Sequence, residues 1–453
     1  MKRRDFITRA GWLAALPFLS AAALGKSSVP KKVLIIGAGM AGAAAARKLK
    51  DRGCEVTLLE ARNRTGGRIH THRDWGYPVE LGANWIHDAG DTDNPLLSLA
   101  EKLDISIRKT NFNSIGLFDL EGNTVNKIAI ARFYLQFNKA FKQGAPELLV
   151  KETDASLAEM VDYVTRDKKY SEKEKAILAL ITEGMANTLG TALDNGSAKY
   201  YLTQPITKAP LDFLVTGGYQ RVVDYLLRDI PVELNTVVRE IRTDNERLEI
   251  ITEQTTYPAD FVIVTVPISI LQQQRIIFSP ALPHWKINSF SKMQLGLFNK
   301  VVMEFHSKFW KGDKHFYMHN TSLGNAFGGA LNYDHYLNKP VLISMPVDRS
   351  AKWVEENDTE TIQATWKEIL HKAHRGKEIE FKNILVTRWQ GDDYARGSYS
   401  HVPVGSVAAD FEALQQEVGR IHFAGEATQV TQHGTVQGAY NSGVREAMKI
   451  LSM

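Results

Sequence analysis

The chain has 453 residues, of which 44% are hydrophobic and 23% are charged, so it is long enough for two or more domains and has the composition of a soluble globular enzyme. Its single cysteine, Cys54, excludes an intramolecular disulfide and a cysteine-rich metal site. Of the formal charge of +4, residues 1–23 contribute +3, which leaves the remainder close to neutral and indicates no basic patch for a nucleic-acid partner.

Residues 1–24 have the pattern of a twin-arginine signal peptide. Arg3 and Arg4 precede an apolar stretch that is shorter than the ~20 residues a membrane span needs, and Ala21 to Ala23 are small residues of the kind a signal peptidase cuts after. A short amphipathic N-terminal helix is the alternative interpretation. Because this pathway exports folded proteins, we expect transient contact with the twin-arginine export machinery, a periplasmic or secreted location and no stable membrane span.

The first strong secondary-structure signal predicts a βαβ unit. Val33–Ile36 is an apolar run typical of a buried parallel strand, Ala41–Asp51 has a helical pattern, and Glu55–Glu60 predicts a second strand. A comparable strand signal returns at Phe261–Val266 and at Arg420–Ala424, and a helix is expected from about Gly434 to Leu451.

Two regions of different character lie between these signals. Residues 95–205 have helical patterns, as in Ser171–Met185, whereas residues 295–395 mix strands with a helix over Asp358–Ala373. The predicted strands there are Asn299–Phe305, Val341–Pro346 and Ile384–Trp389. We therefore predict an α/β protein with a Rossmann-type nucleotide-binding domain from discontinuous segments (31–94, 206–294 and 396–453) and an inserted α+β substrate-binding domain (95–205 and 295–395).

A glycine-rich turn joins the first strand to the first helix. In the pattern G-x-G-x-x-G, Gly37 permits the tight turn, Gly39 lets the backbone approach a pyrophosphate, and Gly42 lets helix and strand pack closely. The pyrophosphate would then lie at the helix N-terminus. Glu60 ends the second strand, where its carboxylate can accept the hydroxyls of a ribose. NAD and FAD share this turn, so the pattern alone leaves the dinucleotide open.

A second glycine pair follows in Arg64–Arg68, the sequence RTGGR. Such a pair can present N–H groups and a guanidinium to a longer cofactor, which favours FAD, although a surface turn would have the same sequence.

With these motifs and others in the same order, the chain resembles the flavin-containing amine oxidases, a family that includes polyamine oxidases, monoamine oxidases and flavin-dependent histone lysine demethylases. Within the family its motifs are most similar to those of the polyamine oxidases. The further motifs are Glu80–His87, Gly217–Tyr219, Leu295–Val301, Ala395–Ser400, Phe423–Thr428 and Gly434–Ala439, and they cover nearly the whole chain after residue 31.

The resemblance implies that the nucleotide-binding domain binds FAD. No cysteine lies between Arg396 and Gly405, where monoamine oxidases tether their flavin, so FAD is expected to bind noncovalently. Val238, in a strand expected over Thr236–Ile241, corresponds to the family's backbone contact with adenine. The full set of implied cofactor contacts is Gly37, Gly39, Ala41, Gly42, Glu60, Ala61, Arg62, Gly67, Arg68, Gly82, Ala83, Asn84, Trp85, Val238, Trp389, Gly425, Glu426, Gly434, Thr435 and Val436.

The resemblance also implies catalytic residues. Lys300 corresponds to the lysine that reaches flavin N5 through a water, and Tyr399 and Thr435 occupy the positions where monoamine oxidases face the flavin with two tyrosines. His87 corresponds to a histidine of animal-type polyamine oxidases and could hydrogen-bond a substrate nitrogen. On the residues alone, a solvated strand lysine is the favoured interpretation of Lys300, and Tyr399 and His87 could be packed structural residues.

The reaction implied by the family is oxidation of a small-molecule amine. Hydrogen passes from the carbon beside the nitrogen to the flavin, the resulting imine is hydrolysed, and O2 is reduced to H2O2. Polyamines are the expected substrates, and acidic residues are expected to line an entrance for them, namely Asp88, Asp91, Asp93 and Glu183. The alternatives are an L-amino-acid oxidase, a monoamine-type oxidase and a flavoprotein that acts as a partner or electron carrier.

Overall fold

A computed structural model describes residues 30–87, 94–149, 154–203, 211–244, 247–319 and 329–453. The predicted signal peptide and Asp88, Asp91 and Asp93 lie outside these residues. Within the described ranges, no helix combines the length and the apolar character needed to cross a membrane.

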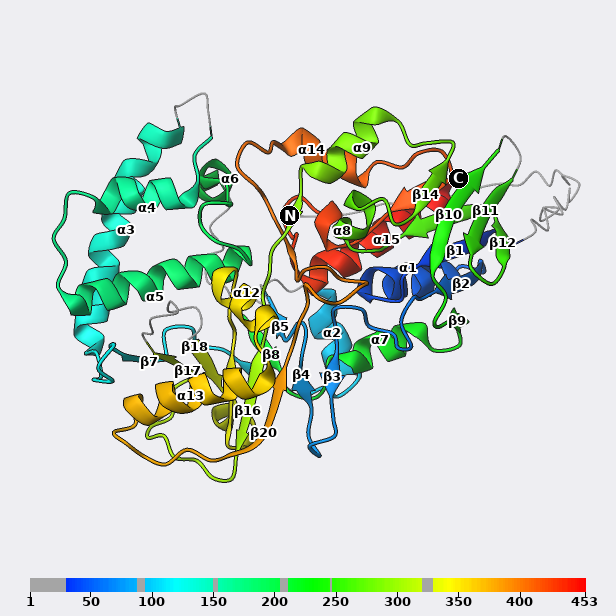
Figure 1. The fold of residues 1–453 in the computed structure, drawn as a ribbon. Helices are drawn as coiled ribbons and strands as arrows, with labels where there is room; N and C mark the ends of the chain where they lie inside the picture. Colours follow the sequence, from blue (N-terminus) through cyan, green and yellow to red (C-terminus); the bar gives the residue numbers. More distant parts are fainter. Residues whose placement is uncertain (1–29, 88–93, 150–153, 204–210, 245–246, 320–328) are drawn as a thin grey trace, which may run out of the picture. The chain divides into compact units, whose positions relative to one another are not determined.

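The centre of the nucleotide-binding region is a five-stranded parallel sheet (Figure 1). Its order is β22 (Ile421–Phe423), β13 (Phe261–Val264), β1 (Lys32–Ile36), β2 (Glu55–Leu59) and β9 (Val232–Glu233). The predicted strands at residues 33, 55, 261 and 420 are therefore confirmed to within a few residues. Strands buried on both faces need continuous apolar runs, and this requirement made them visible in the sequence.

Three helices pack with this sheet: α1 (Met40–Lys50), α7 (Gln220–Leu227) and α15 (Val436–Ser452). Helices α1 and α15 approach each other closely at Gly443. A β-carbon there would lie only 2.1 Å from the carbonyl oxygen of Ala41, so the position requires glycine. The helix predicted from about residue 434 begins two residues later, since Thr435 caps it by accepting a hydrogen bond from the N–H of Gly438 (2.9 Å).

A second sheet in the same region was not predicted as a whole. It has the order β12 (Thr256–Ala259), β11 (Leu248–Thr252), β10 (Val238–Thr243) and β14 (Ile277–Ser279). Only the strand holding Val238 was expected. Buried and half-buried residues alternate in β11, and β12 has no buried residue, so these strands lack the fully buried apolar runs that mark the parallel sheet.

The largest sheet has six strands, with the order β20 (Phe381–Val386), β16 (Val301–Phe305), β19 (Val341–Ser344), β18 (Gly329–Asn332), β17 (Phe316–His319) and β7 (Ile115–Phe118). Helix α13 (Thr359–Ala373) packs on β20 and confirms the helix predicted over Asp358–Ala373, with Asp358 as the cap of its first turn. These strands all come from the two predicted segments of the substrate-binding domain. The division of the chain into domains stays a prediction.

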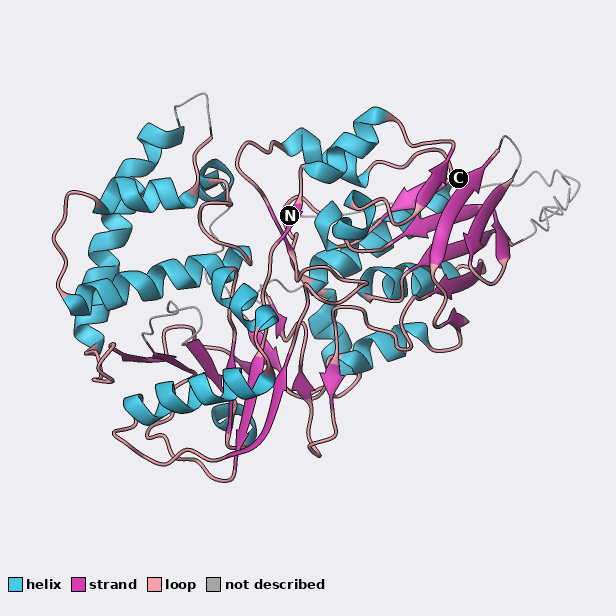
Figure 2. Ribbon diagram, viewed as in Figure 1, coloured by secondary structure: helices cyan, strands magenta, loops and turns pink. Residues whose placement is uncertain are grey.

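Helices dominate residues 127–203 (Figure 2). Helix α3 (Lys127–Leu149) contacts α4 (Leu157–Thr165), α5 (Glu172–Leu189) and α6 (Ala198–Thr203). Helix α5 begins at a capping box formed by Ser171 and Glu174 and ends at Gly190, which adopts a left-handed conformation (φ 74°). The predicted helix over Ser171–Met185 is confirmed and extends one turn further.

Short elements connect these layers. The strands are β3 (Thr71–His72) with β4 (Val79–Glu80), β5 (Trp85–Ile86) with β8 (Phe213–Val215) and β6 (Ile107–Lys109), and β15 (Gln294–Leu295) with β21 (Ser400–His401). The remaining helices are α2 (Pro95–Lys102), α8 (Ile268–Gln272), α9 (His284–Ser291), α11 (Asp334–Leu337), α12 (Arg349–Glu356), α14 (Ala408–Gln415) and the 3-10 turn η1 (Glu426–Thr428).

Candidate functional site

The turn before α1 has the geometry that a pyrophosphate requires. Gly37 has a positive φ of 103°, and Gly39 is an N-cap with no side chain to cap the helix. The first turn of α1 also has no acidic residue. The N–H groups and the positive end of the helix dipole are therefore available to an anion, so this part of the chain fits a dinucleotide.

Gly42 is expected to be essential for this turn. A β-carbon at Gly42 would overlap the carbonyl oxygen of Gly37 and would lie 3.2 Å from the Thr265 hydroxyl. We expect Gly42→Ala to weaken dinucleotide affinity at least about tenfold, because the backbone of the turn must shift. Gly184→Ala is the matched control, since a β-carbon there meets nothing within 4 Å in helix α5.

The measurement for this pair is fluorescence titration of the flavin-free proteins with FAD. Gly184→Ala should bind as the wild type does and melt slightly higher, because alanine stabilises a helix by about 0.5–1 kcal/mol relative to glycine. Equal FAD affinity in all three proteins would show that the turn does not hold the cofactor.

The predicted ribose ligand lies beside this turn. Glu60 is buried, and its carboxylate accepts hydrogen bonds from the backbone N–H groups of Ala38 (2.7 Å) and Arg62 (2.9 Å). The carbonyl oxygen of Glu60 accepts from Thr236 N (2.8 Å), so the segment leading to Val238 runs alongside the acid. The structure thus brings Glu60, Ala61, Arg62 and Val238 together. Each carboxylate oxygen keeps lone pairs for further donors.

The second glycine pair lies against the first. Gly66 donates its N–H to the carbonyl oxygen of Ala38 (2.8 Å) and forms a parallel bridge with Gly39. The guanidinium of Arg62 is held by Asp392, a residue that the sequence analysis did not select. Asp392 is 330 positions away and carries no local motif that would indicate this pairing.

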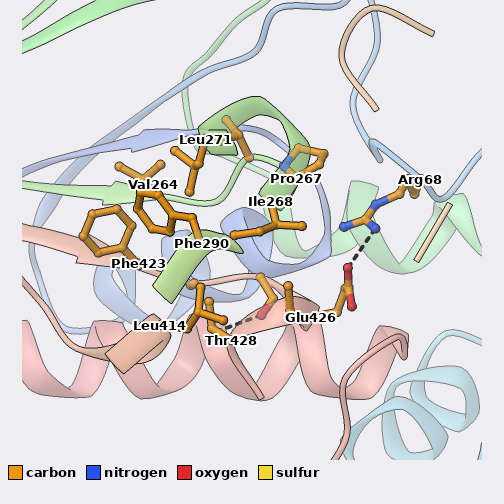
Figure 3. A pocket seen from close by; sticks show the side chains of 14 residues that line it. Arg68, Val264, Pro267, Ile268, Leu271, Phe290, Leu414, Phe423, Glu426 and Thr428 are labelled. Carbon is orange, nitrogen blue, oxygen red and sulfur yellow. Dashed lines mark hydrogen bonds and ion pairs between the residues drawn. The ribbon is translucent and has the colours of Figure 1, made fainter. Parts of the chain in front are cut away.

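Arg68 and Glu426 form a partly buried ion pair (2.8 Å) at one end of a pocket (Figure 3). Glu426 also accepts hydrogen bonds from Ser400 and from Gly434 N (2.7 Å), and Arg68 donates to the carbonyl oxygen of Ser398 (2.6 Å). Burial raises the pKa of the Glu426 carboxyl. Arg68 and these hydrogen-bond donors lower it by more than burial raises it, so the net shift of the pKa is downward. Gly425 also lines the pocket, which therefore collects three predicted cofactor residues.

Lys300 lies just before β16 and is only 2% exposed. Its Nζ donates to the backbone carbonyl oxygens of Glu80 (2.7 Å) and Gly82 (2.6 Å). Gly82 packs against the carbonyl of Arg68, and Ala83 donates its N–H to the same oxygen (3.1 Å). Lys300 is therefore not a solvated strand lysine. Its side chain contacts the segment Glu80–His87, one of the motifs of the family resemblance.

Tyr399 and the glycine-rich segment after η1 form one wall of the site. The Tyr399 ring is close to Gly434, and its hydroxyl donates to the carbonyl oxygen of Asn187 at the end of α5. Burial raises the pKa of this phenol. Thr435 uses its hydroxyl as the cap of α15, which begins at Val436. Trp389 is buried three residues after the end of β20 and donates its backbone N–H to the side chain of Asn299, the residue before Lys300 (3.0 Å).

His87 forms a pair that the sequence analysis did not predict. Its Nδ1 lies 3.2 Å from a carboxylate oxygen of Asp212, which is buried, whereas the imidazole is about half exposed. His87 directly follows β5, and Asp212 directly precedes β8. These two strands pair with each other. Strand pairing brings the histidine and the acid together, and no motif or spacing in the sequence would have indicated it.

The structure buries one of the acids that were expected to line an entrance. Glu183 on α5 is only 5% exposed, and its side chain faces the start of β18, since a β-carbon at Gly329 would lie 2.6 Å from its Oε1. Among the described residues, neither carboxylate oxygen has a hydrogen-bond partner, and burial raises its pKa. Helix α5 contacts α3 and the residues at Gly329 and Tyr399, so the pattern of polar and apolar residues along α5 does not show which of its faces is buried.

A parallel sheet with a glycine turn before α1 and a buried acid after β2 defines a dinucleotide-binding protein of the Rossmann type. The family described as flavin containing amine oxidoreductase matches residues 40–451, and the chain belongs to that family. It is therefore a flavin-dependent oxidoreductase that acts on amines.

The chain aligns with curated relatives over most of its length. The chain is 31% identical to polyamine oxidase 5 of Oryza sativa subsp. japonica, over 93% of this chain and 87% of the relative. It is 32% identical to lysine-specific histone demethylase 1 homolog 2 of Arabidopsis thaliana, over 92% of this chain and 58% of the relative. A solved structure of putrescine oxidase bound to putrescine has the same fold, with a TM-score of 0.75, 21% identity, and coverage of 94% of this chain and 100% of the other.

Proposed function

We propose that this protein is a polyamine oxidase that holds FAD noncovalently, uses O2 as the electron acceptor and releases H2O2. The observation that carries this proposal is the buried Lys300, whose ammonium is fixed on two carbonyls beside the predicted flavin segment. The absence of a cysteine between Arg396 and Gly405 supports noncovalent binding, and Cys54 is buried between α1 and β2.

When bound, FAD would supply the two-electron acceptor for the hydrogen beside the substrate nitrogen. The residues that would hold it are the turn at Gly37–Gly42 and Glu60 for the adenosine diphosphate part, and Arg68 with the Gly82 segment for the remainder. The Tyr399 ring would orient the amine by its face. The imidazole of His87, with Nδ1 directed at Asp212, would offer Nε2 to a substrate nitrogen.

Glu183 supports a substrate with more than one amine. It lies one helical turn before Asn187, whose carbonyl holds the Tyr399 hydroxyl. A carboxyl group buried there without a partner among the described residues can accept a second ammonium of an extended amine, and the pairing would favour its ionised form. Putrescine is the amine named for the solved relative, and the name polyamine oxidase recurs among the curated relatives.

The experiment is a peroxide-release screen on purified, flavin-loaded protein with spermine, spermidine, putrescine, phenylethylamine and L-amino acids. Turnover of polyamines supports the proposal, and turnover of amino acids alone or of phenylethylamine alone contradicts it. A yellow, folded protein that oxidises none of them would instead be a partner or an electron carrier. Acid precipitation tests the mode of binding, since noncovalent FAD stays in the supernatant.

Glu183→Gln is expected to lower kcat/KM for the preferred polyamine at least about tenfold, because a buried ammonium loses its counter-charge. The same variant should change kcat/KM for a monoamine by less than about twofold. The comparison of the two substrates on one protein separates loss of charge recognition from damage to the fold. A parallel loss for both substrates would remove Glu183 from polyamine recognition.

For the cellular location we propose export through the twin-arginine pathway to the periplasm or beyond. The support is the pattern of residues 1–24 alone. Arg3→Lys together with Arg4→Lys should retain the protein in the cytoplasm, which cell fractionation would measure.

A further inference from the structure

Helix α3 has apolar residues on two opposite sides. Phe133, Phe137 and Phe141 recur every four residues and are buried in a hydrophobic core with residues of α4, α5 and α6. Ile128 and Leu135 lie about two helical turns apart on the other side, where they are 77% and 70% exposed. They are the most exposed large hydrophobic side chains among the described residues, so this second side is an apolar surface that the fold leaves uncovered.

The same side of α3 is positively charged. Residues 127–146 include four basic residues and no acidic residue. One acid of another helix, Glu174 at the start of α5, interacts with Arg132, and its carboxylate is already bound to Ser171. The exposed side of a helix in a soluble protein is normally polar, whereas this one combines large apolar side chains with cations. We define the outer face of α3 by its exposed residues Ile128, Ala131, Arg132, Leu135, Lys139 and Lys142.

The start of α3 has two unfavourable electrostatic arrangements. Lys127 is the first residue of the helix, at the positive end of its dipole. Its ammonium also lies beside that of Lys314, two residues before β17, and this like charge lowers the pKa of Lys314. Asp313 acts on Lys314 in the opposite sense but is itself paired with His335 (2.7 Å). Neither position of Lys127 helps the fold, and a negatively charged group beside it would relieve both.

Charge and hydrophobicity together select what covers the outer face. In a symmetric dimer built on this face, the cations of one copy would meet those of the other. The predicted leader has a net charge of +3 over residues 1–23, so it has the same sign as α3. An anionic lipid bilayer offers phosphates for the cations and, directly beneath them, an apolar layer for Ile128 and Leu135.

We propose that the outer face of α3 docks this protein on an anionic lipid bilayer, with Ile128 and Leu135 inserted at the headgroup boundary and the lysines among the lipid phosphates. The inference goes beyond the proposed function and does not depend on which amine is oxidised. The contact is peripheral and reversible, because it uses one face of a helix whose other face belongs to the core.

The test is flotation of the full-length, flavin-loaded protein with vesicles of phosphatidylcholine alone or mixed equally with phosphatidylglycerol. We expect at least about tenfold tighter binding to the mixed vesicles, and loss of that preference in about 0.5 M salt. Ile128→Asp with Leu135→Asp should weaken binding at least about tenfold, and Lys139→Gln with Lys142→Gln at least about fivefold.

Matched controls lie on other elements. Ile277 and Val407 are both 59% exposed, so Ile277→Asp with Val407→Asp makes the same apolar-to-acid change outside α3. Lys367 and Lys372 are exposed on α13, and Lys367→Gln with Lys372→Gln removes the same charge as the lysine pair of α3. Both controls should bind the mixed vesicles within about twofold of wild type, since the changes lie outside the outer face.

A second readout is local to α3, because the apolar leader is present in every protein and is itself able to bind vesicles. An environment-sensitive dye is attached to Ala131→Cys, and Cys54 does not compete because it is buried. Its emission should shift to the blue with the mixed vesicles and not with phosphatidylcholine alone. The same dye on Ala364→Cys, at an exposed position of α13, should not shift.

An unshifted emission from the Ala131→Cys dye on the mixed vesicles would overturn the proposal, whatever the leader binds. So would a stable dimer in vesicle-free sedimentation that Ile128→Asp with Leu135→Asp dissociates, because the outer face would then belong to a second copy. Peroxide release without vesicles should be unchanged in all these variants, since no outer-face residue belongs to the candidate site. A protein that binds vesicles through α3 but oxidises no amine would therefore refute the proposed function alone.

Discussion

Replacing Lys300 with methionine is expected to slow reoxidation of the reduced enzyme by O2 at least about 100-fold, the range typical for loss of a positioned acid–base group. The ammonium is buried and bonded to the carbonyl oxygens of Glu80 and Gly82. Bulk water therefore does not reach this position to supply the proton donor that the variant lacks. Methionine is unbranched and one atom shorter than lysine, so it fills most of the same space without the charge. FAD should still bind, because among the described residues the side chain of Lys300 donates hydrogen bonds only to those two carbonyl oxygens. Stopped-flow mixing of the reduced enzyme with O2 gives the rate.

Lys286 offers a matched control elsewhere in the chain. It is 0% exposed, lies on α9, and donates to the carbonyl oxygens of Ala413 (3.1 Å), Leu414 (2.7 Å) and Gln416 (2.7 Å) at the end of α14. Burial lowers its pKa to about 7. Lys286→Met should therefore destabilise the protein, by about 1–3 kcal/mol for each carbonyl left unsatisfied, without slowing either half-reaction per bound flavin. Similar slowing in both variants would show that the Lys300 effect is one of stability.

Local patterns predicted the nucleotide-binding turn well. The run Val33–Ile36, the glycines at 37, 39 and 42, and Glu60 lie within one βαβ unit, so their geometry depends on residues close in sequence. The burial and role of Lys300 could be expected only from the family resemblance. Its two carbonyl partners are 220 and 218 positions away, and its own sequence is equally typical of an exposed strand.

Contacts between distant segments account for most of what the sequence did not predict. The partners of Arg62 and His87, Asp392 and Asp212, become neighbours only when β20 and β8 take their places in different sheets. The burial of Glu183 has a similar origin, because it depends on the packing of α5 against residues near β18. Hydropathy reports the polarity of a residue and not the elements that will cover it, so the sequence of a predicted helix does not indicate which of its acids will be buried.

Arg68→Met is expected to destabilise the flavin-free protein by about 3–5 kcal/mol at pH 7, the range for removing one partner of a buried ion pair. Glu426 would remain buried with its bonds from Ser400 and Gly434 but without an opposite charge. Arg239→Met is the control, because Arg239 pairs with Glu253 on the surface, where both side chains are about half exposed. An exposed pair contributes about 0–1 kcal/mol. In urea titrations followed by circular dichroism, the unfolding free energy of this variant should therefore be close to that of the wild type.

The pH dependence of the Arg68→Met defect identifies its cause. In the wild type the net shift of the Glu426 pKa is downward, so its carboxylate contributes stability that is present above the unfolded pKa of about 4.3 and is lost as pH falls through the folded pKa. Without Arg68 the effect of burial dominates, and the pKa of Glu426 rises. The variant then carries the cost of a buried charge at pH 7, and protonation relieves that cost as pH falls toward 4. The difference in unfolding free energy between wild type and Arg68→Met should therefore shrink on acidification, whereas a difference that stays constant from pH 7 to pH 4 would mean that Arg68 stabilises the site through packing and its bond to Ser398 rather than through charge.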